Sequence, residues 1–297
     1  MLVIQELNKT YNNGIRAIEN ISLTIEPGIF GLLGPNGAGK SSLMRTLATL
    51  QDADSGLVTL DGVDIFEDPQ KTRRWLGYLP QDFGVYPNVS AEELLDLLAV
   101  FKGFVKARQR RDMVAYQLQL VNLYEKRKQK LGTFSGGMRQ RFGIAQALLG
   151  EPKLVIVDEP MAGLDPTERI RFQNLLAEIS KDRVLILSTH IVEDVASLCP
   201  QMAILNQGKI VTQGSPFELM EQLHGKVWMK VMSPTEAGNM KEELTVITAR
   251  MRQGKRYVRI FSETAPDEGF DEVEPELNDV YFSALASKKD ILAKAKT

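Results

Sequence analysis

The feature that most constrains this chain is a glycine-rich segment, GPNGAGKSS, at residues 34–42. It matches the pattern G-x-x-x-x-G-K-[ST], in which glycines let consecutive backbone N–H groups turn toward an anion. An apolar run at 29–33 precedes the segment, and a helix-compatible stretch at 40–50 follows it. The chain is therefore predicted to run strand, loop, helix, which brings the positive end of a helix to the same anion.

This loop is predicted to bind a nucleoside triphosphate together with Mg²⁺. Lys40 can reach the β- and γ-phosphates, and Ser41 can ligate the metal ion. The alternative is a plain glycine-rich turn, which the position between a strand and a helix disfavours. The residues predicted to hold the phosphates are Gly34, Pro35, Asn36, Gly37, Ala38, Gly39, Lys40, Ser41 and Ser42.

The rest of residues 1–222 favours an α/β fold. Two apolar, β-branched-rich runs at 153–157 and 183–188 flank a predicted helix at 166–180. This alternation argues for a parallel sheet buried on both faces. Further strands are expected within 1–26 and 57–66, with turns at Asn13-Gly14 and Asp61-Gly62, and further helices at 90–104, 106–121 and 137–149.

Near residue 222 the character of the chain changes. Strands are expected at 226–232 and 255–261, and a helix at 276–289. We expect two domains, a nucleotide-binding domain at 1–222 and a small α+β accessory domain at 223–297.

Composition excludes several classes of protein. The net charge of −2 provides no overall attraction to nucleic acid, so no direct nucleic-acid partner is expected. Only one cysteine, Cys199, is present, which excludes a disulfide framework or a multi-cysteine zinc site. No signal peptide is expected at the start, and no apolar run approaches the length of a membrane span.

Polar side chains follow several predicted elements further along the chain. Asp158 and Glu159 end a buried strand, where a carboxylate suits Mg²⁺ and its neighbour can polarise a water molecule. A serine and two glycines at 135–137 precede a helix, His190 ends a strand, and Gln81 follows a short apolar run. Taken singly, each also fits a structural role, such as a solvated loop, a helix cap or a structural histidine.

In combination these pieces resemble a known family. Their order along the chain is similar to that of the ATP-binding subunit of an ABC transporter, and the resemblance covers about residues 1–222. It implies a P-loop NTPase core with an N-terminal antiparallel β-subdomain and a helical subdomain. The matching pieces are the loop at 34–42, Gln81, SGG at 135–137, Asp158-Glu159, AGLD at 162–165 and His190.

The resemblance implies a role for each matched residue on the phosphate-loop side. Tyr11 would stack on the adenine ring, although a surface hairpin tyrosine is the alternative. Glu159 would be the general base for the attacking water, and His190 would contact that water and the γ-phosphate. Gln81 would sense Mg²⁺ and the γ-phosphate. The family's remaining phosphate and metal contacts would come from Lys40, Ser41, Ser42 and Asp158.

The resemblance further implies that two such chains sandwich ATP head to tail. Ser135, Gly136 and Gly137 of one chain would bind the γ-phosphate held by the other, and Asp165 would cross the interface. The usual signature LSGGQ reads FSGGM here, so Met138 removes a polar side chain near the nucleotide. Glu159 and His190, to which the resemblance gives catalytic roles, are both present, so a homodimer would have two complete sites; a heterodimer is the alternative.

The resemblance places this chain at the cytoplasmic face of the cell membrane, bound to separate permease subunits. Residues 91–130 would touch the permease, and their basic residues form either a docking surface or a solvated face. The segment EPELNDVYF at 274–282 resembles the end of exporter-type subunits, which favours export over import. The alternatives are a non-transport ABC ATPase acting on ribosomes or DNA, and a regulatory module without turnover.

Overall fold

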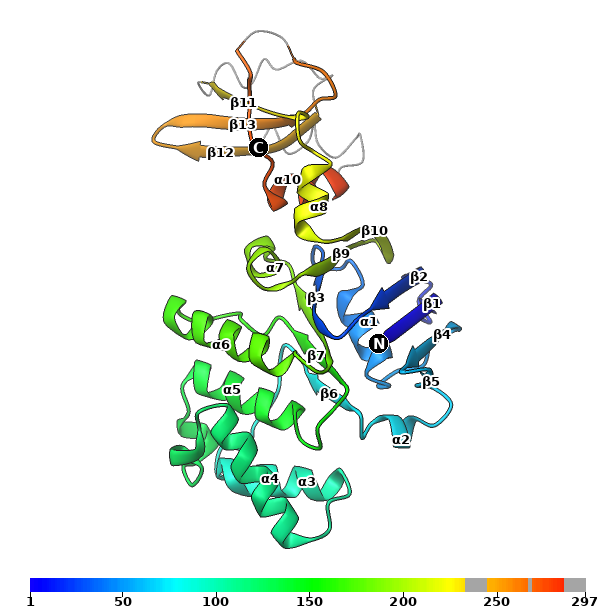
Figure 1. The fold of residues 1–297 in the computed structure, drawn as a ribbon, viewed down its shortest axis with the longest axis vertical. Coiled ribbons are helices and arrows are strands. Elements are labelled where there is room, and N and C mark those ends of the chain that lie inside the picture. Colours follow the sequence, from blue (N-terminus) through cyan, green and yellow to red (C-terminus); the bar gives the residue numbers. More distant parts are fainter. Residues whose placement is uncertain (233–244, 267–268, 286–297) are drawn as a thin grey trace. The chain divides into compact units, whose positions relative to one another are not determined.

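The structure is a computed structural model that describes residues 1–232, 245–266 and 269–285 (Figure 1). The chain forms two compact units. The first comprises Met1–His190 and Leu205–Ile210, and the second comprises Ile191–Ile204 and Val211–Thr297. These units are defined by packing, and the domain boundary near residue 222 stays a prediction.

An antiparallel sheet opens the first unit, with strand order β2-β1-β4-β5. Leu2 of β1 pairs with Ile25 on one side and with Leu60 on the other. In β2, alternate residues are buried, as the alternating sequence predicted. Both expected turns are present. The strands are β1 (Leu2–Thr10), β2 (Arg16–Ile25), β4 (Ser55–Leu60) and β5 (Val63–Asp64).

A parallel sheet forms the centre of the first unit, where its strands are ordered β3-β8-β7-β6. Almost every residue of β3, β7 and β8 is buried, which is why these strands are continuous apolar runs and do not alternate. Parallel pairing brings the carboxyl ends of β3, β7 and β8 to one edge. The strands are β3 (Gly28–Leu33), β6 (Leu76–Leu79), β7 (Leu154–Asp158) and β8 (Val184–Thr189).

Helices of the first unit follow the predicted order. Helices α3, α4 and α5 pack against one another (Figure 1). The predicted helix at 40–50 ends early, at Leu47, because Thr49 adopts a left-handed conformation with φ of +56°. The helices are α1 (Lys40–Leu47), α2 (Pro69–Thr72), α3 (Ala91–Phe101), α4 (Ala107–Leu120), α5 (Gly136–Ala147) and α6 (Pro166–Ile179).

The second unit contains an antiparallel sheet with strand order β12-β13-β11-β14. Helix α10 packs against α7, α8 and β12, and its buried Asp279 accepts two hydrogen bonds from Arg259 of β13. The elements are α7 (Val192–Leu198), α8 (Pro216–Glu221), β11 (Val227–Met232), β12 (Thr245–Arg252), β13 (Lys255–Phe261), β14 (Asp271–Glu272) and α10 (Leu277–Leu285).

Strands β9 (Gln201–Asn206) and β10 (Lys209–Gly214) each contain residues of both units. Sequence patterns did not predict them, nor β12. Residues 286–289 of the predicted C-terminal helix lie outside the described part of the chain.

The predicted fold class is confirmed: a P-loop α/β core with an antiparallel β-subdomain, a helical subdomain and a C-terminal antiparallel sheet with helices. Within the described residues, each helix is too short or too polar to cross a membrane.

Candidate nucleotide-binding site

The glycine-rich loop connects β3 to α1, and two of its glycines are required by close backbone contacts. A Cβ atom at Gly34 would lie 2.4 Å from the carbonyl oxygen of Leu205. At Gly39 a Cβ atom would lie 2.3 Å from the carbonyl oxygen of Ala17, and φ is +107°. A side chain at either position would push rigid backbone apart, so only glycine lets the loop take this path.

Lys40 begins α1 and lies beneath the loop, with a side chain only 7% exposed. Its Nζ donates hydrogen bonds to the carbonyl oxygens of Gly34 (2.7 Å) and Pro35 (3.2 Å). Burial lowers the pKa of the Lys40 ammonium, and the negative charges of Glu159 and Asp158 act in the opposite direction. The ammonium is therefore a positive charge held in a partly desolvated place.

Asp158 ends β7 and faces the start of α1. Its Oδ2 accepts a hydrogen bond of 3.1 Å from Ser41 Oγ, although the two residues lie far apart in sequence. The carboxylate is 3% exposed, and its Oδ1 has no hydrogen-bond partner among the described residues. A buried carboxylate oxygen beside a serine hydroxyl is a donor set that suits a hard cation such as Mg²⁺.

Glu159 follows directly and has a left-handed backbone conformation, with φ of +49°. Its carboxylate is 7% exposed; Oε1 lies 2.8 Å from Nδ1 of His190 and 4.0 Å from Nζ of Lys40. Thr189 Oγ1 donates a hydrogen bond of 3.4 Å to the other carboxylate oxygen. The pairing of β7 with β8 brings these side chains together, because both strands end at the same edge.

A cavity of about 540 Å³ opens above this edge. Two predicted residues from outside the loop and β7, Tyr11 and Gln81, line it. The other predicted residues in its lining are Pro35, Asn36, Gly37, Gly39, Lys40, Ser41, Ser42, Asp158 and Glu159. His190 is joined to the site through Glu159. Gly34 and Ala38 lie behind the lining, where the Ala38 carbonyl accepts a hydrogen bond from the Gly208 N–H.

Sequence reasoning missed part of the lining. Ile15, Arg16 and Ala17 come from the start of β2 and the turn before it, and Gln207 and Gly208 come from the β9–β10 turn. Asn206-Gln207-Gly208 has the composition of a turn, but nothing in the local sequence relates that turn to the phosphate loop.

The predicted signature residues lie away from this lining. Ser135 is the N-cap of α5 and accepts a hydrogen bond of 3.3 Å from the Met138 N–H. Asp165 is the N-cap of α6 and accepts one of 2.9 Å from the Glu168 N–H. A Cβ atom at Gly137 would lie 2.6 Å from Glu168 Oε2, whereas Gly136 faces open space. Within one chain, these residues and the cavity are therefore separate features.

The sequence is similar to those of several ATP-binding proteins. A family model described as ABC transporter matches residues 18–162. The chain is 35% identical over 244 residues to the uncharacterized ABC transporter ATP-binding protein YxlF of Bacillus subtilis, covering 82% of this chain and 80% of YxlF. It is 34% identical to the linearmycin resistance ATP-binding protein LnrL of the same organism, covering 76% and 72%. It is 32% identical to the probable multidrug ABC transporter ATP-binding protein YbhF of Escherichia coli, covering 91% of this chain and 49% of YbhF.

Solved structures of ABC proteins have folds similar to that of this chain. The ATP-binding cassette MJ0796, a dimer in a post-hydrolysis state bound to ADP and Pi, matches with a TM-score of 0.65 at 25% identity, over 72% of this chain and 98% of that one. The cbiO1 protein of Clostridium perfringens, part of an ABC transporter complex, matches with a TM-score of 0.68 at 28% identity, over 74% and 90%.

A phosphate loop and an acidic strand end at one edge of a parallel sheet define a P-loop nucleotide-binding protein. Within that class, this chain belongs to the ATP-binding proteins of ABC transporters, and it is an ATPase.

Proposed function

We propose that this chain hydrolyses ATP at the cavity above β3, β7 and β8, as one half of a head-to-tail dimer that powers transport. The observation that carries the proposal is the convergence of Lys40, Asp158 and Glu159 around one cavity. A buried cation, a potential metal ligand and a potential base are the groups that phosphoryl transfer to water requires.

Lys40 and the N–H groups of the loop hold the phosphates in this proposal. Ser41 and Asp158 hold Mg²⁺, with Gln81 as a further ligand, and Mg²⁺ when bound neutralises charge on the phosphates. The Asp158 Oδ1 atom supports this assignment, because a buried carboxylate oxygen without a hydrogen-bond partner suits a metal-bound water. Ser42 supplies another hydroxyl at the same helix end.

Glu159 is proposed as the general base that takes the proton of the attacking water. Its carboxylate is buried but lines the cavity, so a water there would lose that proton to a desolvated oxygen. His190 is proposed to orient Glu159 and to contact the γ-phosphate; its Nδ1 distance of 2.8 Å from Glu159 supports the first role.

Tyr11 is proposed to stack on adenine. Tyr11 lines the cavity and is 37% exposed, which supports contact of its ring with a flat apolar partner. The remaining residues of the site are proposed to act from a second subunit. Ser135, Gly136, Gly137 and Asp165 lie outside the cavity lining of their own chain, which supports a role in trans.

A second copy of this chain is the proposed dimer partner, and separate permease subunits carry the transport path. We further propose that the chain acts in export at the cytoplasmic face of the membrane. The name of the Nod factor export ATP-binding protein I of Burkholderia thailandensis, 31% identical to this chain, supports export. Residues 91–130 are proposed to meet the permease, and residues 223–297 to form the accessory domain.

ATP-dependent dimerisation tests the proposal. Glu159→Gln should elute as a dimer with ATP and Mg²⁺, and mainly as a monomer with ADP, measured by light scattering after size exclusion. Adding Ser135→Arg should abolish the dimer but leave ATP binding to the monomer intact. Gln109→Arg, an exposed residue of α4, is the matched control and should leave the dimer unchanged. A monomer under ATP would contradict the proposal.

A further inference from the structure

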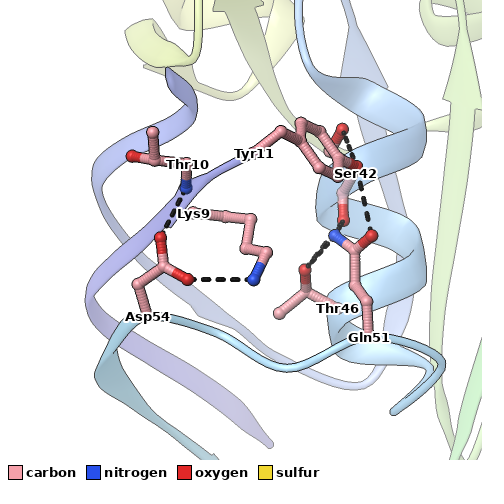
Figure 2. Close-up of polar contacts among 7 residues, drawn as sticks. All are labelled: Lys9, Thr10, Tyr11, Ser42, Thr46, Gln51 and Asp54. Atoms are coloured by element: carbon pink, nitrogen blue, oxygen red, sulfur yellow. Dashed lines mark hydrogen bonds and ion pairs between the residues drawn. The ribbon is translucent and has the colours of Figure 1, made fainter. Parts of the chain in front are cut away.

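Tyr11 is held at the cavity by a residue outside the predicted motifs. Its hydroxyl lies 3.0 Å from Ser42 Oγ and 3.1 Å from Oε1 of Gln51, which follows α1 (Figure 2). The Gln51 amide is anchored in turn: its Nε2 donates to the Ser42 carbonyl oxygen (2.9 Å) and to Thr46 Oγ1 (2.8 Å). Both ends of the Gln51 amide are therefore used.

The directions of these hydrogen bonds follow from donor chemistry. The Ser42 carbonyl only accepts, so the NH₂ group of Gln51 faces α1 and the Gln51 oxygen faces Tyr11. That oxygen only accepts, so the single hydroxyl hydrogen of Tyr11 goes to Gln51. Ser42 must then donate its own hydrogen to Tyr11.

The two hydrogen bonds of the Tyr11 hydroxyl should respond differently to a bound phosphate. A phosphate oxygen also only accepts, so a phosphate bound at Ser42 competes with Tyr11 for the single hydrogen of the serine hydroxyl. The Gln51 bond does not depend on that hydrogen. Gln51 therefore stays hydrogen-bonded to Tyr11 whether the Ser42 hydroxyl donates to Tyr11 or to a phosphate.

The backbone before Tyr11 is held from the same segment of chain. Asp54 accepts hydrogen bonds from Lys9 Nζ (2.9 Å) and from the Thr10 N–H (2.6 Å), and its own N–H donates to the Asn8 carbonyl (2.9 Å). The Lys9 and Thr10 bonds hold the pKa of the Asp54 carboxyl below its usual range. Residues 51–54 thus restrain Tyr11 through its hydroxyl and through the backbone that precedes it (Figure 2).

We propose that Gln51 is a positioning residue for nucleotide binding: it holds the Tyr11 ring at the rim of the cavity and so favours ligands that carry a base. The inference rests on the proposed role of Tyr11 at adenine. Pre-positioning a ring removes the conformational cost of ordering it when the base arrives. Gln51 acts through Tyr11 and does not itself line the cavity.

The test compares MgATP with magnesium tripolyphosphate, which has phosphates but no base. Gln51→Met keeps the length of the side chain and removes both hydrogen-bonding groups. We expect the ratio of the MgATP dissociation constant to that of magnesium tripolyphosphate to rise about 3–10-fold, the loss typical of one hydrogen bond. KM for ATP should rise and kcat at saturating ATP should not change. Gln70→Met, on the exposed side of α2, is the matched control.

A double-mutant cycle of Gln51 and Tyr11 separates two roles of Gln51, the positioning of Tyr11 and the support of helix α1. Tyr11→Phe alone should raise the same ratio, and adding Gln51→Met to it should raise the ratio no further. Tyr11→Phe also keeps the test available if Gln51→Met does not fold. An equal loss for both ligands would show that Gln51 merely supports α1, and would overturn the inference.

Lys40→Ala distinguishes this inference from the proposed function. If Lys40→Ala weakens MgATP binding and Gln51→Met leaves the ratio at its original value, the positioning role of Gln51 is wrong and the phosphate site stands. If Lys40→Ala leaves MgATP binding unchanged, the proposed site itself is wrong, and the inference fails with it.

Discussion

Replacing Glu159 by glutamine should separate ATP hydrolysis from ATP binding. The amide has the shape of the carboxylate and can still face Nδ1 of His190, which now lies 2.8 Å from Glu159 Oε1. It cannot take a proton from water, however. A lost general base lowers kcat by about 10²–10⁴-fold. At about 1.4 kcal/mol per tenfold, this is about 3–5 kcal/mol of transition-state stabilisation.

Glu159→Gln should bind MgATP as tightly as the original protein does, or more tightly. Glu159 Oε1 lies 4.0 Å from Lys40 Nζ, and both side chains are 7% exposed, so the carboxylate partly neutralises the lysine charge. Glutamine removes that negative charge from a cavity that receives an anion. Lys40 keeps its bonds to the carbonyl oxygens of Gly34 and Pro35, so its position is preserved. The dissociation constant for MgATP should stay constant or fall.

Phosphate release at saturating ATP gives kcat, and isothermal titration calorimetry gives the dissociation constant. Glu178→Gln, on the exposed side of α6, makes the same chemical change away from the cavity and should match the original protein in both. Phosphate release from Glu159→Gln within about threefold of the original rate would refute the general-base assignment, since a threefold change is far smaller than the loss that removing a general base causes.

Three further predictions concern binding and stability. Lys40→Ala should weaken MgATP binding by at least about tenfold in calorimetry, because a charge-assisted contact to phosphate is lost; an unchanged value would exclude the phosphate-loop assignment. Gly39→Ala should lower the free energy of unfolding in urea by about 2 kcal/mol or more, because its Cβ would meet the Ala17 carbonyl. Gly37→Ala has a similar positive φ but open space, so it should lose less. Burial lowers the pKa of Lys102 to about 8, so the unfolded chain holds this proton to higher pH. The free energy of unfolding should therefore rise with pH above about 8, by at most about 3 kcal/mol relative to Lys102→Met; parallel curves for the two proteins would contradict this.

Local features of the fold could be predicted because each depends on near neighbours. A helix was expected at 90–104, where Ser90 and Glu93 have the spacing of a capping box, and α3 begins there with both reciprocal hydrogen bonds. The early end of α1 could not be predicted, because the apolar pattern of the sequence continues to Leu50. In the structure the helix ends at Leu47, since Thr49 has a left-handed conformation. Arg73 donates hydrogen bonds to the Thr49 hydroxyl and carbonyl, a contact that no local pattern encodes.

By itself, the sequence determined the phosphate loop, the central strands and the residue types that accompany them, because backbone conformation and burial pattern are set over a few residues. Only the tertiary structure decided which of these residues meet. Ser41 contacts Asp158, Glu159 contacts His190, and Tyr11 contacts Gln51 across long stretches of chain. The physical reason is that such contacts depend on strand order and register, which each strand's own residues leave open until the strands pack together.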